Sequence, residues 1–401
     1  MYKLSGKIQH YAWGGFEFIP QLLHIENNND QPFAEYWLGT HPNGSAILEY
    51  DSNNQVNLSQ HIKENPQKIL GTKVANDFGN LPYLLKVLDV REMLSIQVHP
   101  TKTAAEEGFA KENEMGIPLD AAHRNYKDDN HKPEVMVALS EFWLLHGFKE
   151  EEPLLATLKK TAPLNFLLPV FEKEGYRGLY KHVMEKPQNE VDDLWNPYLR
   201  QLQQSFHQNQ LSKTDPDYWA CKALVNVSGQ NKRIDRGIFS IYLFNIVHLS
   251  PGQAIFQGAG IPHAYLEGQN IELMSNSDNV LRGGLTPKHI DVPELLKHTL
   301  FKGVTPRIMN GEKRGTETIY RCPVPDFQVS KIEIDLNSDY QHSAYSAEIL
   351  LLTEGEGDIS SGQKVICLKK GESVFIPADE SYQITTNSFA TIYKAAVPSG
   401  H

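Results

Sequence analysis

Short apolar runs separated by Gly, Pro and polar residues dominate the first part of the chain. Residues 83–88 (YLLKVL) and 135–139 (VMVAL) are examples, rich in Val, Leu and Met. Apolar runs of about four to eight residues that end at turn-forming residues are typical of buried β-strands. Residues 1–150 are therefore predicted to form a β-rich domain.

The pattern changes between residues 151 and 225. Leu154, Leu155 and Leu158 recur at the spacing of a helix face, and a polar, Gln-rich stretch follows at residues 199–206. Apolar residues spaced three and four apart mark one side of an α-helix. Residues 151–225 are therefore predicted to be a helical insert.

Strand-like runs return at Gly237. They predict a central β region over residues 226–314 and a C-terminal β domain over residues 315–401. The expected fold class is thus mainly β, with an α-helical insert.

Two local features are predicted within these β regions. A short helix is expected at residues 292–298, because Asp291 can cap its first turn and Pro293 fits there without losing a helical hydrogen bond. Further on, the apolar positions shift phase by one residue between Val329 and Ile332, which predicts a β-bulge.

One segment of the central region is repeated in the C-terminal domain. Gly252 is followed eleven positions later by His263, and Gly371 is followed at the same interval by Tyr382. Both segments resemble the second motif of a cupin-type jelly roll, in which a Gly turn and a buried strand lead to a His that faces the barrel interior. Because Tyr382 replaces that His, the C-terminal barrel is predicted to hold no metal.

Composition and charge narrow the class of protein. The chain has 401 residues, enough for two or three domains, and its 40% hydrophobic and 22% charged content is usual for a folded protein. A net charge of −11 without a concentrated basic segment argues against a nucleic-acid partner.

The cysteines and the chain start indicate a cellular compartment. Cys221, Cys322 and Cys367 lie far apart, and they fit neither a thiolate zinc site nor a disulfide framework. The first residues contain no apolar signal core, and the most apolar run, residues 238–249, is too short to span a membrane. A cytoplasmic protein without a membrane partner is expected.

Scattered polar residues between the apolar runs predict a metal site. Gln97 and His99 are two residues apart in a run rich in Val and Ile, so on a strand they would share one face. Glu134 and His263 each stand where a polar segment meets an apolar run, a position where loops and strand ends carry chemistry. The combination predicts a metalloenzyme.

Five long motifs are distributed along nearly the whole chain: residues 11–14 (YAWG), 34–42 (AEYWLGTHP), 94–100 (LSIQVHP), 126–134 (YKDDNHKPE) and 277–288 (SDNVLRGGLTPK). Together they resemble the motifs of type I mannose-6-phosphate isomerase (phosphomannose isomerase). The resemblance implies two cupin-like jelly-roll β domains with an inserted helical domain, in agreement with the patterns above.

The resemblance also implies a ligand set. In that family the matching positions bind zinc, so Gln97, His99, Glu134 and His263 are expected to hold one Zn²⁺ per chain. The Arg of the NVLR segment, Arg282 here, is expected in the active site.

The implied reaction is the interconversion of mannose 6-phosphate and fructose 6-phosphate through a cis-enediol or enediolate. Moving a proton between adjacent carbons develops negative charge on the sugar oxygens. A zinc ion with only one carboxylate ligand keeps much of its charge and can polarise the carbonyl. Arg282 would add a fixed cation beside the same oxygens, and phosphate binding or a structural ion pair are its alternative roles.

The sequence leaves the proton carrier open. Glu272, His131 and Asp278 are candidates, as is zinc-bound water, because each can hold a suitable pKa near the sugar. Glu272 follows His263 by nine residues and can return along the same barrel wall.

Further substrate contacts are expected from polar residues inside the same motifs. Ser95 is expected on the strand face of Gln97. Lys86 stands inside an apolar run, where an unpaired ammonium would be costly. The other candidates are Lys132, Tyr265, Asp278 and Lys288.

Two other functions are compatible with the sequence. A cupin with His and Glu ligands can bind iron and act as a metal-dependent oxygenase, because imidazole and carboxylate do not select zinc by themselves. A cupin that keeps the pocket without turnover would be a non-catalytic sugar-phosphate-binding protein. A monomer is expected, although the sequence fixes neither the oligomeric state nor the range of aldose phosphates.

Overall fold

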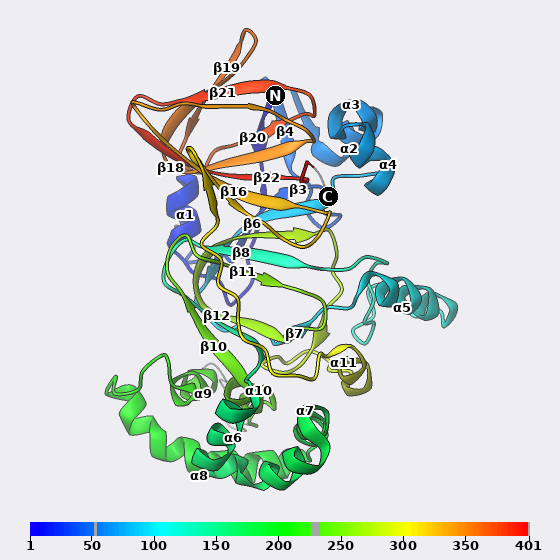
Figure 1. The fold of residues 1–401 in the computed structure, drawn as a ribbon, viewed down its shortest axis with the longest axis vertical. Coiled ribbons are helices and arrows are strands. Elements are labelled where there is room, and N and C mark those ends of the chain that lie inside the picture. Colours follow the sequence, from blue (N-terminus) through cyan, green and yellow to red (C-terminus); the bar gives the residue numbers. More distant parts are fainter. Residues whose placement is uncertain (52–53, 226–232, 400–401) are drawn as a thin grey trace.

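The computed structural model describes residues 1–51, 54–225 and 233–399. Figure 1 shows three regions stacked along the longest axis: a β region that holds both chain ends, a second β region, and a layer of helices at the opposite end. Helix α5 (Lys102–Glu114) projects sideways from the middle region.

The first β region is a 12-stranded antiparallel sheet. Its main path runs in the order β14 (Glu312–Arg314), β15 (Glu317–Tyr320), β16 (Gln328–Asp335), β22 (Phe389–Ala396), β18 (Glu348–Ser361), β20 (Ser373–Ile376), β1 (Tyr2–Ser5), β4 (Ile47–Asp51) and β5 (Asn54–Asn57). Beside this path, β18 pairs with β19 (Lys364–Lys369) and β21 (Ser381–Thr385), and β21 pairs with β17 (Tyr340–Ser343). The sheet curls around an apolar interior that includes Ile332, Ile359 and Ile384.

The second β region is a 10-stranded antiparallel sheet centred on one long strand, β12 (His263–Ser275). Its main path runs in the order β10 (Phe244–Leu249), β9 (Phe142–Phe148), β12, β6 (Tyr83–Val90), β3 (Glu35–Gly39) and β2 (Lys7–Gln9). β12 also pairs with β7 (Gln97–Val98) and β8 (Glu134–Ala138), which in turn pair with β13 (Leu281–Arg282) and β11 (Ala254–Gln257).

Helices form the far layer and the flanks of the molecule. The layer comprises α6 (Glu151–Lys160), the 3₁₀ helix η1 (Ala162–Leu167), α7 (Leu168–Met184), α8 (Gln188–His207), α9 (Pro216–Val225) and α10 (Gly237–Leu243). The flanking helices are α1 (Phe18–Leu23), α2 (Leu58–Glu64), α3 (Pro66–Leu70), α4 (Thr72–Phe78), α5 and α11 (Val292–His298). The predicted fold class, mainly β with a helical insert, is confirmed.

The expectation that strands return at Gly237 is wrong, because a helix precedes the first strand there. The residues from Gly237 to Leu243 form α10, all of them buried, and β10 begins only at Phe244. A continuous apolar run does not distinguish a buried helix from a buried strand, because neither has a polar face. The short helix predicted at residues 292–298 is confirmed as α11, with Asp291 accepting a hydrogen bond from the N–H of Glu294.

Strands from residues 1–150 take part in both sheets. β1, from the N-terminal block, pairs with β4 on one side and with β20 of the C-terminal block on the other. The N-terminal residues therefore complete the sheet of the C-terminal domain. The first part of the expected central block, residues 226–232, lies outside the described residues.

An apolar layer joins the two sheets. Val87 and Ile271 from the 10-stranded sheet pack in one cluster with Ile349 and Phe375 from the 12-stranded sheet. Because this layer covers one face of β6, β8 and β12, the alternate residues of those strands face the interior of the second barrel. That interior holds the polar residues of the candidate site.

A β-bulge in β12 lets its two halves present side chains to the same interior. The register with β9 shifts between Tyr265 and Glu267, which inserts one extra residue. His263 and Glu272 are nine residues apart and would face opposite sides of a regular strand. The extra residue restores the phase, so both side chains point into the barrel.

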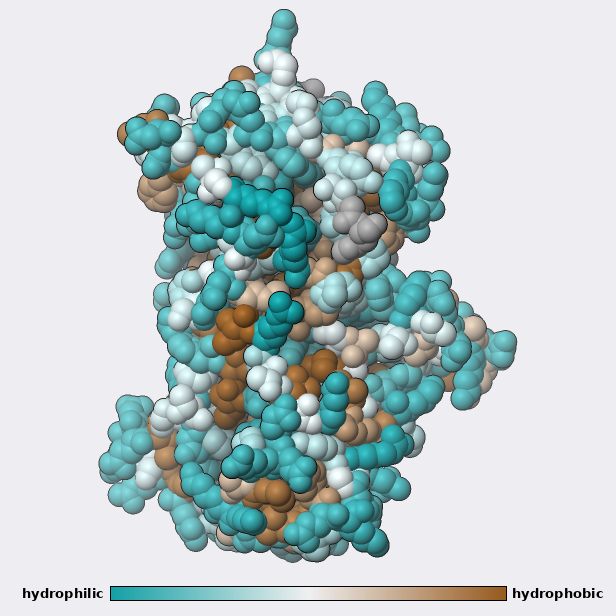
Figure 2. Space-filling model, viewed as in Figure 1, coloured by the Kyte–Doolittle hydropathy of each residue, from teal (hydrophilic) through white to brown (hydrophobic). Residues whose placement is uncertain are grey.

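The outer surface is mainly polar. Figure 2 shows a largely hydrophilic face, with apolar side chains exposed chiefly over the middle and lower parts of the view. No helix among the described residues combines the length and apolarity needed to cross a membrane.

Candidate active site

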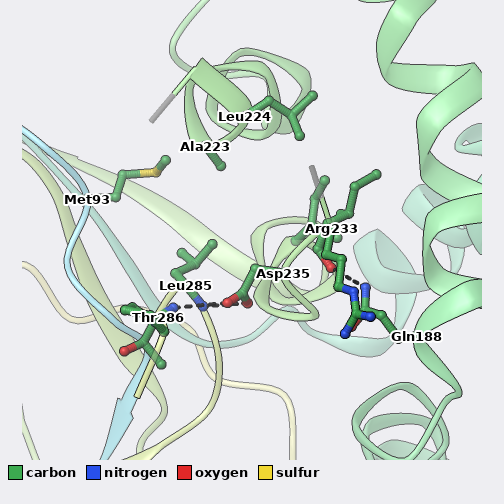
Figure 3. A pocket seen from close by; sticks show the side chains of 11 residues that line it. Met93, Gln188, Ala223, Leu224, Arg233, Asp235, Leu285 and Thr286 are labelled. Atoms are coloured by element: carbon green, nitrogen blue, oxygen red, sulfur yellow. Dashed lines mark hydrogen bonds between the residues drawn. The ribbon is translucent and has the colours of Figure 1, made fainter. Parts of the chain in front are cut away.

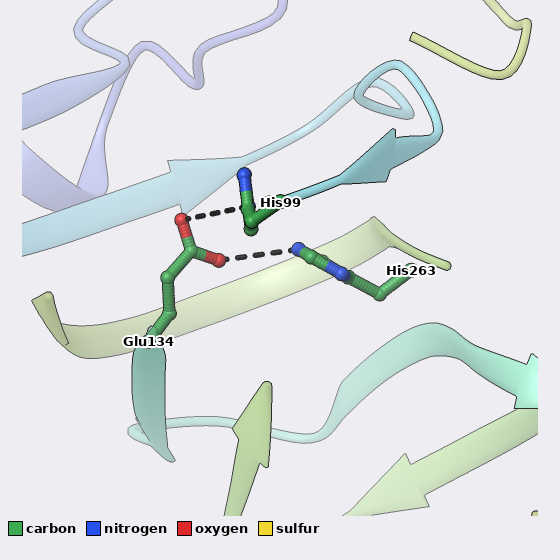
Figure 4. A group of neighbouring side chains, drawn as sticks. All are labelled: His99, Glu134 and His263. Carbon is green, nitrogen blue, oxygen red and sulfur yellow. Dashed lines mark hydrogen bonds and ion pairs between the residues drawn. The ribbon is translucent and has the colours of Figure 1, made fainter. Parts of the chain in front are cut away.

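Three buried side chains converge inside the second barrel. His99 follows β7, Glu134 begins β8 and His263 begins β12, and all three are at most 3% exposed. Their ligand atoms lie within 4.8 Å of one another (Figure 4). Three potential metal ligands from distant parts of the sequence thus meet at one point.

Backbone carbonyls fix the ring nitrogens of the two histidines. His99 Nδ1 lies 2.9 Å from the carbonyl oxygen of Asn279. His263 Nδ1 lies 2.9 Å from the carbonyl oxygen of Ile261. Since a carbonyl can only accept, each Nδ1 carries the hydrogen and each Nε2 presents a lone pair.

Both Nε2 lone pairs face the carboxylate of Glu134. His99 Nε2 lies 3.4 Å from one carboxylate oxygen, and His263 Nε2 lies 3.2 Å from the other. His99 Nε2 is buried and has no hydrogen-bond partner among the described residues. Burial lowers the pKa of His99 to about 4, although Glu134 acts in the opposite direction. The ring of His99 is therefore neutral near pH 7. The two Nε2 lone pairs and the Glu134 carboxylate repel one another, and a cation bound between them would remove this repulsion. The nitrogen and oxygen donors fit zinc.

Lys132 supports the Glu134 carboxylate from the side. Its ammonium lies 2.7 Å from Oε1 of Glu134. Burial alone would raise the pKa of Glu134, but the charge of Lys132 holds it well below its usual value. Glu134 is thus ionised and able to act as a ligand.

Gln97 lies beside the three ligands, although the strand that carries it is shorter than expected. It is directly opposite His263 in the β7–β12 pairing and opposite Arg282 in the β7–β13 pairing. Directly opposed residues share a sheet face, so all three side chains project to the same side. β7 contains only Gln97 and Val98, so both Ser95 and His99 lie outside the strand itself.

A cavity of about 60 Å³ opens beside the cluster. Seven residues singled out from the sequence line it: Lys86, Gln97, Lys132, Glu134, His263, Tyr265 and Glu272. Pockets for small ligands are typically about 300 Å³ or more, so a sugar phosphate would have to extend beyond this cavity.

Lys86 and Glu272 form a buried charged pair in this cavity. They are opposite each other in the β6–β12 pairing, and Lys86 Nζ lies 3.2 Å from Glu272 and 3.4 Å from Glu35. Burial alone would lower the pKa of Lys86, but Glu35, Glu272 and Glu134 hold it above its usual value. Burial raises the pKa of Glu272, against the opposing effect of Lys86. Glu272 is thus a carboxyl group that can hold a proton more readily than usual.

Arg282 is a half-buried cation without a partner. Its guanidinium makes no hydrogen bond or ion pair with any residue of the described chain, and burial lowers its pKa. Lys288 is exposed. Partial burial of its ammonium lowers the pKa of Lys288, and the positive charge of Arg282 lowers this pKa further. The charge of Arg282 is therefore felt at Lys288.

Besides His99, Arg282 and Lys288, which are described above, three expected site residues do not line the cavity. His131 Nε2 lies 2.9 Å from Asp326, and Asp278 is paired with His41 at 3.2 Å. Ser95 is half-buried in the segment before β7. None of the three residues lines the wall that carries Glu272.

The sequence reasoning missed one charged residue of the cavity, Glu35. It lies on β3 and contacts Lys86, and its carboxylate also accepts a hydrogen bond from Trp37 Nε1. A charged residue inside the apolar run of residues 34–39 was the available signal, the same signal that marked Lys86.

The C-terminal barrel has a polar cluster at the matching strand positions. His342 lies opposite Tyr382 in the β17–β21 pairing, as Gln97 lies opposite His263. Tyr382 donates a hydrogen bond of 2.7 Å to Glu348, and His342 Nε2 lies 3.1 Å from the same carboxylate. These polar groups satisfy one another.

The loop that follows Arg282 forms part of the lining of a separate cavity of about 510 Å³ (Figure 3). Most of its lining is apolar, and none of the candidate metal ligands reaches it. One carboxylate oxygen of Asp235 accepts a hydrogen bond from the N–H of Leu285, and the other accepts one from Thr286, at 2.6 and 3.0 Å. This contact fastens the loop to the helical layer.

Comparison with known proteins decides the family. The family model "Phosphomannose isomerase type I, catalytic domain" matches residues 1–151, and "Mannose-6-phosphate isomerase, cupin domain" matches residues 316–392. A mannose-6-phosphate isomerase from Salmonella typhimurium is 40% identical over 394 residues, which cover 95% of this chain and 96% of the relative. The chain belongs to the type I mannose-6-phosphate isomerase family. The predicted resemblance is confirmed.

Other members of the type I mannose-6-phosphate isomerase family match over similar lengths. The mannose-6-phosphate isomerase of Homo sapiens is 34% identical and covers 96% of this chain and 95% of its own length. A crystal structure of the Salmonella typhimurium enzyme bound to fructose 6-phosphate and zinc matches with a TM-score of 0.85 and 36% identity over 99% of both chains. The apo form of that enzyme gives a TM-score of 0.86.

Proposed function

We propose that this protein is a zinc-dependent aldose–ketose isomerase that interconverts mannose 6-phosphate and fructose 6-phosphate. The observation that carries the proposal is the convergence of His99 Nε2, His263 Nε2 and Glu134 next to a cavity lined by Glu272 and Lys86. A relative of the same fold binds zinc and fructose 6-phosphate, which supports the choice of metal and substrate.

One zinc ion would be held by Gln97, His99, Glu134 and His263. When bound, a zinc ion with a single carboxylate ligand supplies a Lewis acid that polarises the sugar carbonyl. Lys132 keeps the Glu134 carboxylate ionised. Lys132 therefore acts more directly on the metal ligand Glu134 than on the sugar.

Glu272 is the proposed proton carrier. As a carboxylate it removes the proton from C2 of the aldose, and as a carboxylic acid it returns a proton to C1, while the proton of the O2 hydroxyl passes to O1 to give the ketose. A raised pKa suits both steps, because the group must exist in both forms near neutral pH. The neighbouring Lys86 ammonium supplies the charge that stabilises the carboxylate form.

Arg282 and Lys288 are the proposed contacts to anionic groups of the substrate. Arg282 lies opposite Gln97, so it projects toward the ligand cluster and is proposed to stabilise negative charge on the sugar oxygens. Lys288 is the proposed phosphate contact. Tyr265 lines the cavity and is the proposed partner of a sugar hydroxyl.

The enzyme is proposed to act as a cytoplasmic monomer. Cys221, Cys322 and Cys367 are free thiols, which suits a reducing compartment. All proposed ligands come from one chain, so no second subunit is needed to complete the site. The chain is also proposed to divide into domains at residues 150, 225 and 314, with the N-terminal strands β1, β4 and β5 packed into the C-terminal sheet.

A coupled enzymatic assay tests the proposal. Purified protein is given mannose 6-phosphate, and the fructose 6-phosphate formed is measured alongside oxygen consumption. We expect isomerisation without oxygen uptake. Binding of mannose 6-phosphate without turnover would make the protein a sugar-phosphate-binding cupin, and metal-dependent oxygen uptake would make it an oxygenase.

A further inference from the structure

Asn279 connects two parts of the candidate metal site. It is 1% exposed and lies in the loop between β12 and β13. Its side chain does not line the cavity or belong to the ligand cluster. Its hydrogen bonds nevertheless reach both segments that carry ligands.

The side-chain amide of Asn279 is fully hydrogen-bonded to one loop. Its Oδ1 accepts from the backbone N–H of Lys127 at 2.7 Å and of Asp128 at 3.3 Å. Its Nδ2 donates to the backbone carbonyls of Asp128 and Asn130, each at 2.8 Å. An amide has two acceptor sites and two donor hydrogens, so this loop uses its whole capacity.

The main-chain carbonyl of the same residue holds His99. It accepts the Nδ1–H of His99 at 2.9 Å, inside a fully buried environment. This hydrogen bond sets both the tautomer and the direction of the ring, because it leaves Nε2 as the free nitrogen. The position of the carbonyl is in turn fixed by the side chain of Asn279.

The loop that Asn279 holds leads directly to a second ligand. Residues 127–130 are followed by residues 131–133 and then by Glu134, the first residue of β8. Asn279 therefore sets the distance between the His99 ring and the segment that ends in Glu134.

We propose that Asn279 is a positioning residue that holds His99 and the segment before Glu134 in the geometry needed to bind the metal ion. The inference rests on the proposed zinc function and adds a residue to it. Replacing the side chain would leave the carbonyl in place but free the loop, so the ring of His99 would lose its fixed orientation.

Two substitutions separate this role from simple packing. Asn279→Ala removes all the side-chain hydrogen bonds. Asn279→Asp keeps the size and one acceptor, but its second oxygen would face the carbonyls of Asp128 and Asn130 and could donate to neither while ionised. Asn276→Ala is the matched control, since Asn276 lies in the same loop and its amide donates to the carbonyl of Leu81 instead.

Zinc affinity is the measurement. Metal-free wild type and the three variants are titrated with zinc in competition with a chromophoric chelator, and the cobalt-substituted proteins are compared by their visible absorption spectra. We expect Asn279→Ala and Asn279→Asp to bind zinc about 10–100-fold more weakly than wild type and to show altered cobalt spectra. Asn276→Ala should keep both the affinity and the spectrum of wild type. If Asn279→Ala does not fold, Asn279→Asp supplies the same comparison.

The outcomes distinguish this inference from the proposed function. Zinc binding by wild type, with affinity and cobalt spectrum unchanged in a folded Asn279 variant, would overturn the positioning role and leave the isomerase proposal intact. An equal loss in Asn276→Ala would also overturn it, because the effect would then belong to the loop in general. A wild-type protein that binds no zinc would overturn both proposals.

Discussion

At the residue scale, Lys86 is a buried charge of the candidate active site. It is 7% exposed and lies between the carboxylates of Glu35 and Glu272. Moving such charges out of water is costly, so each depends on its partners. The ion pair of Lys86 and Glu272 therefore affects both the stability of the barrel and the chemistry proposed for Glu272.

Lys86→Met should impair both stability and activity. It leaves Glu35 and Glu272 buried without their cation, so we expect a loss of about 3–5 kcal/mol in the free energy of unfolding and a large fall in turnover per folded molecule. Urea titration and an isomerase assay on the folded protein measure the two effects.

Lys394→Met is the matched control. Lys394 is also buried and pairs with a carboxylate, Glu317 at 2.9 Å, but it lies in the C-terminal barrel. We expect a similar loss of stability with turnover preserved. Wild-type turnover in Lys86→Met would contradict the role given to Lys86.

Single residues also mark the limit of what the sequence predicts about the site. Gln97, His99, Glu134 and His263 were identified because motifs carry them. Asn279 could not be identified as a positioning residue, because its role depends on hydrogen bonds to residues about 150 positions away in the sequence. Such contacts exist only after the loops are packed together.

At the element scale, two glycine turns start equivalent strands in the two barrels. Gly252 precedes β11 and Gly371 precedes β20, and both have φ of +84°. Side chains other than Gly rarely adopt this region, since Cβ then approaches the following carbonyl oxygen. The surroundings of the two turns differ.

Gly371→Ala should be much more destabilising than Gly252→Ala. A Cβ at Gly371 would lie 2.0 Å from the backbone oxygen of Leu22 in α1, whereas a Cβ at Gly252 would meet only Lys331 Nζ, at 3.7 Å. We expect about 1–2 kcal/mol for Gly252→Ala from the backbone conformation alone and a clearly larger loss for Gly371→Ala. Urea titrations of the two variants decide the point, and equal losses would contradict the packing of α1 against this turn.

One strand, β16, is buried differently on its two faces, and this explains why the predicted bulge is wrong. The phase shift between Val329 and Ile332 predicted a bulge, but β16 pairs with β22 in an uninterrupted register. Val329 packs in the layer between the sheets, whereas Ile332 packs inside the C-terminal barrel. The face that carries Val329 is buried only at the start of the strand, whereas the face that carries Ile332 stays buried to its end, so the apolar positions change phase without an extra residue. A bulge that was not predicted, between Tyr265 and Glu267, lies in a strand whose apolar pattern conceals it.

At the scale of the whole molecule, a half-buried lysine lies where the helical layer joins the second barrel. Lys149 follows β9, and its ammonium donates a hydrogen bond to Thr157 of α6 at 3.2 Å. Burial lowers the pKa of Lys149 from the usual 10.5 to about 8, although Asp215 acts in the opposite direction.

Stability should therefore rise with pH in the window between these two values. Between about pH 8 and 10.5 the unfolded chain binds more protons at this lysine than the folded chain, so raising the pH favours the folded state. Below pH 8 both forms are protonated, and the folded protein bears the full cost of the buried charge.

Lys149→Met should remove this contribution. We expect its melting temperature to exceed that of wild type most near pH 7, with a smaller difference near pH 10. Lys159→Met, at an exposed position of α6, should show no such pH-dependent difference from wild type. A constant difference between Lys149→Met and wild type across this range would contradict the lowered pKa.

The central claim is that one zinc ion per chain, held by the residues around Glu134, makes this molecule an isomerase. The most direct test is to titrate metal-free protein with zinc and to follow fructose 6-phosphate formation from mannose 6-phosphate. We expect no turnover without metal and a rate that rises linearly until one zinc ion per chain is bound, with Glu134→Gln needing a large excess. Full turnover in the metal-free protein, or none at saturating zinc, would contradict it.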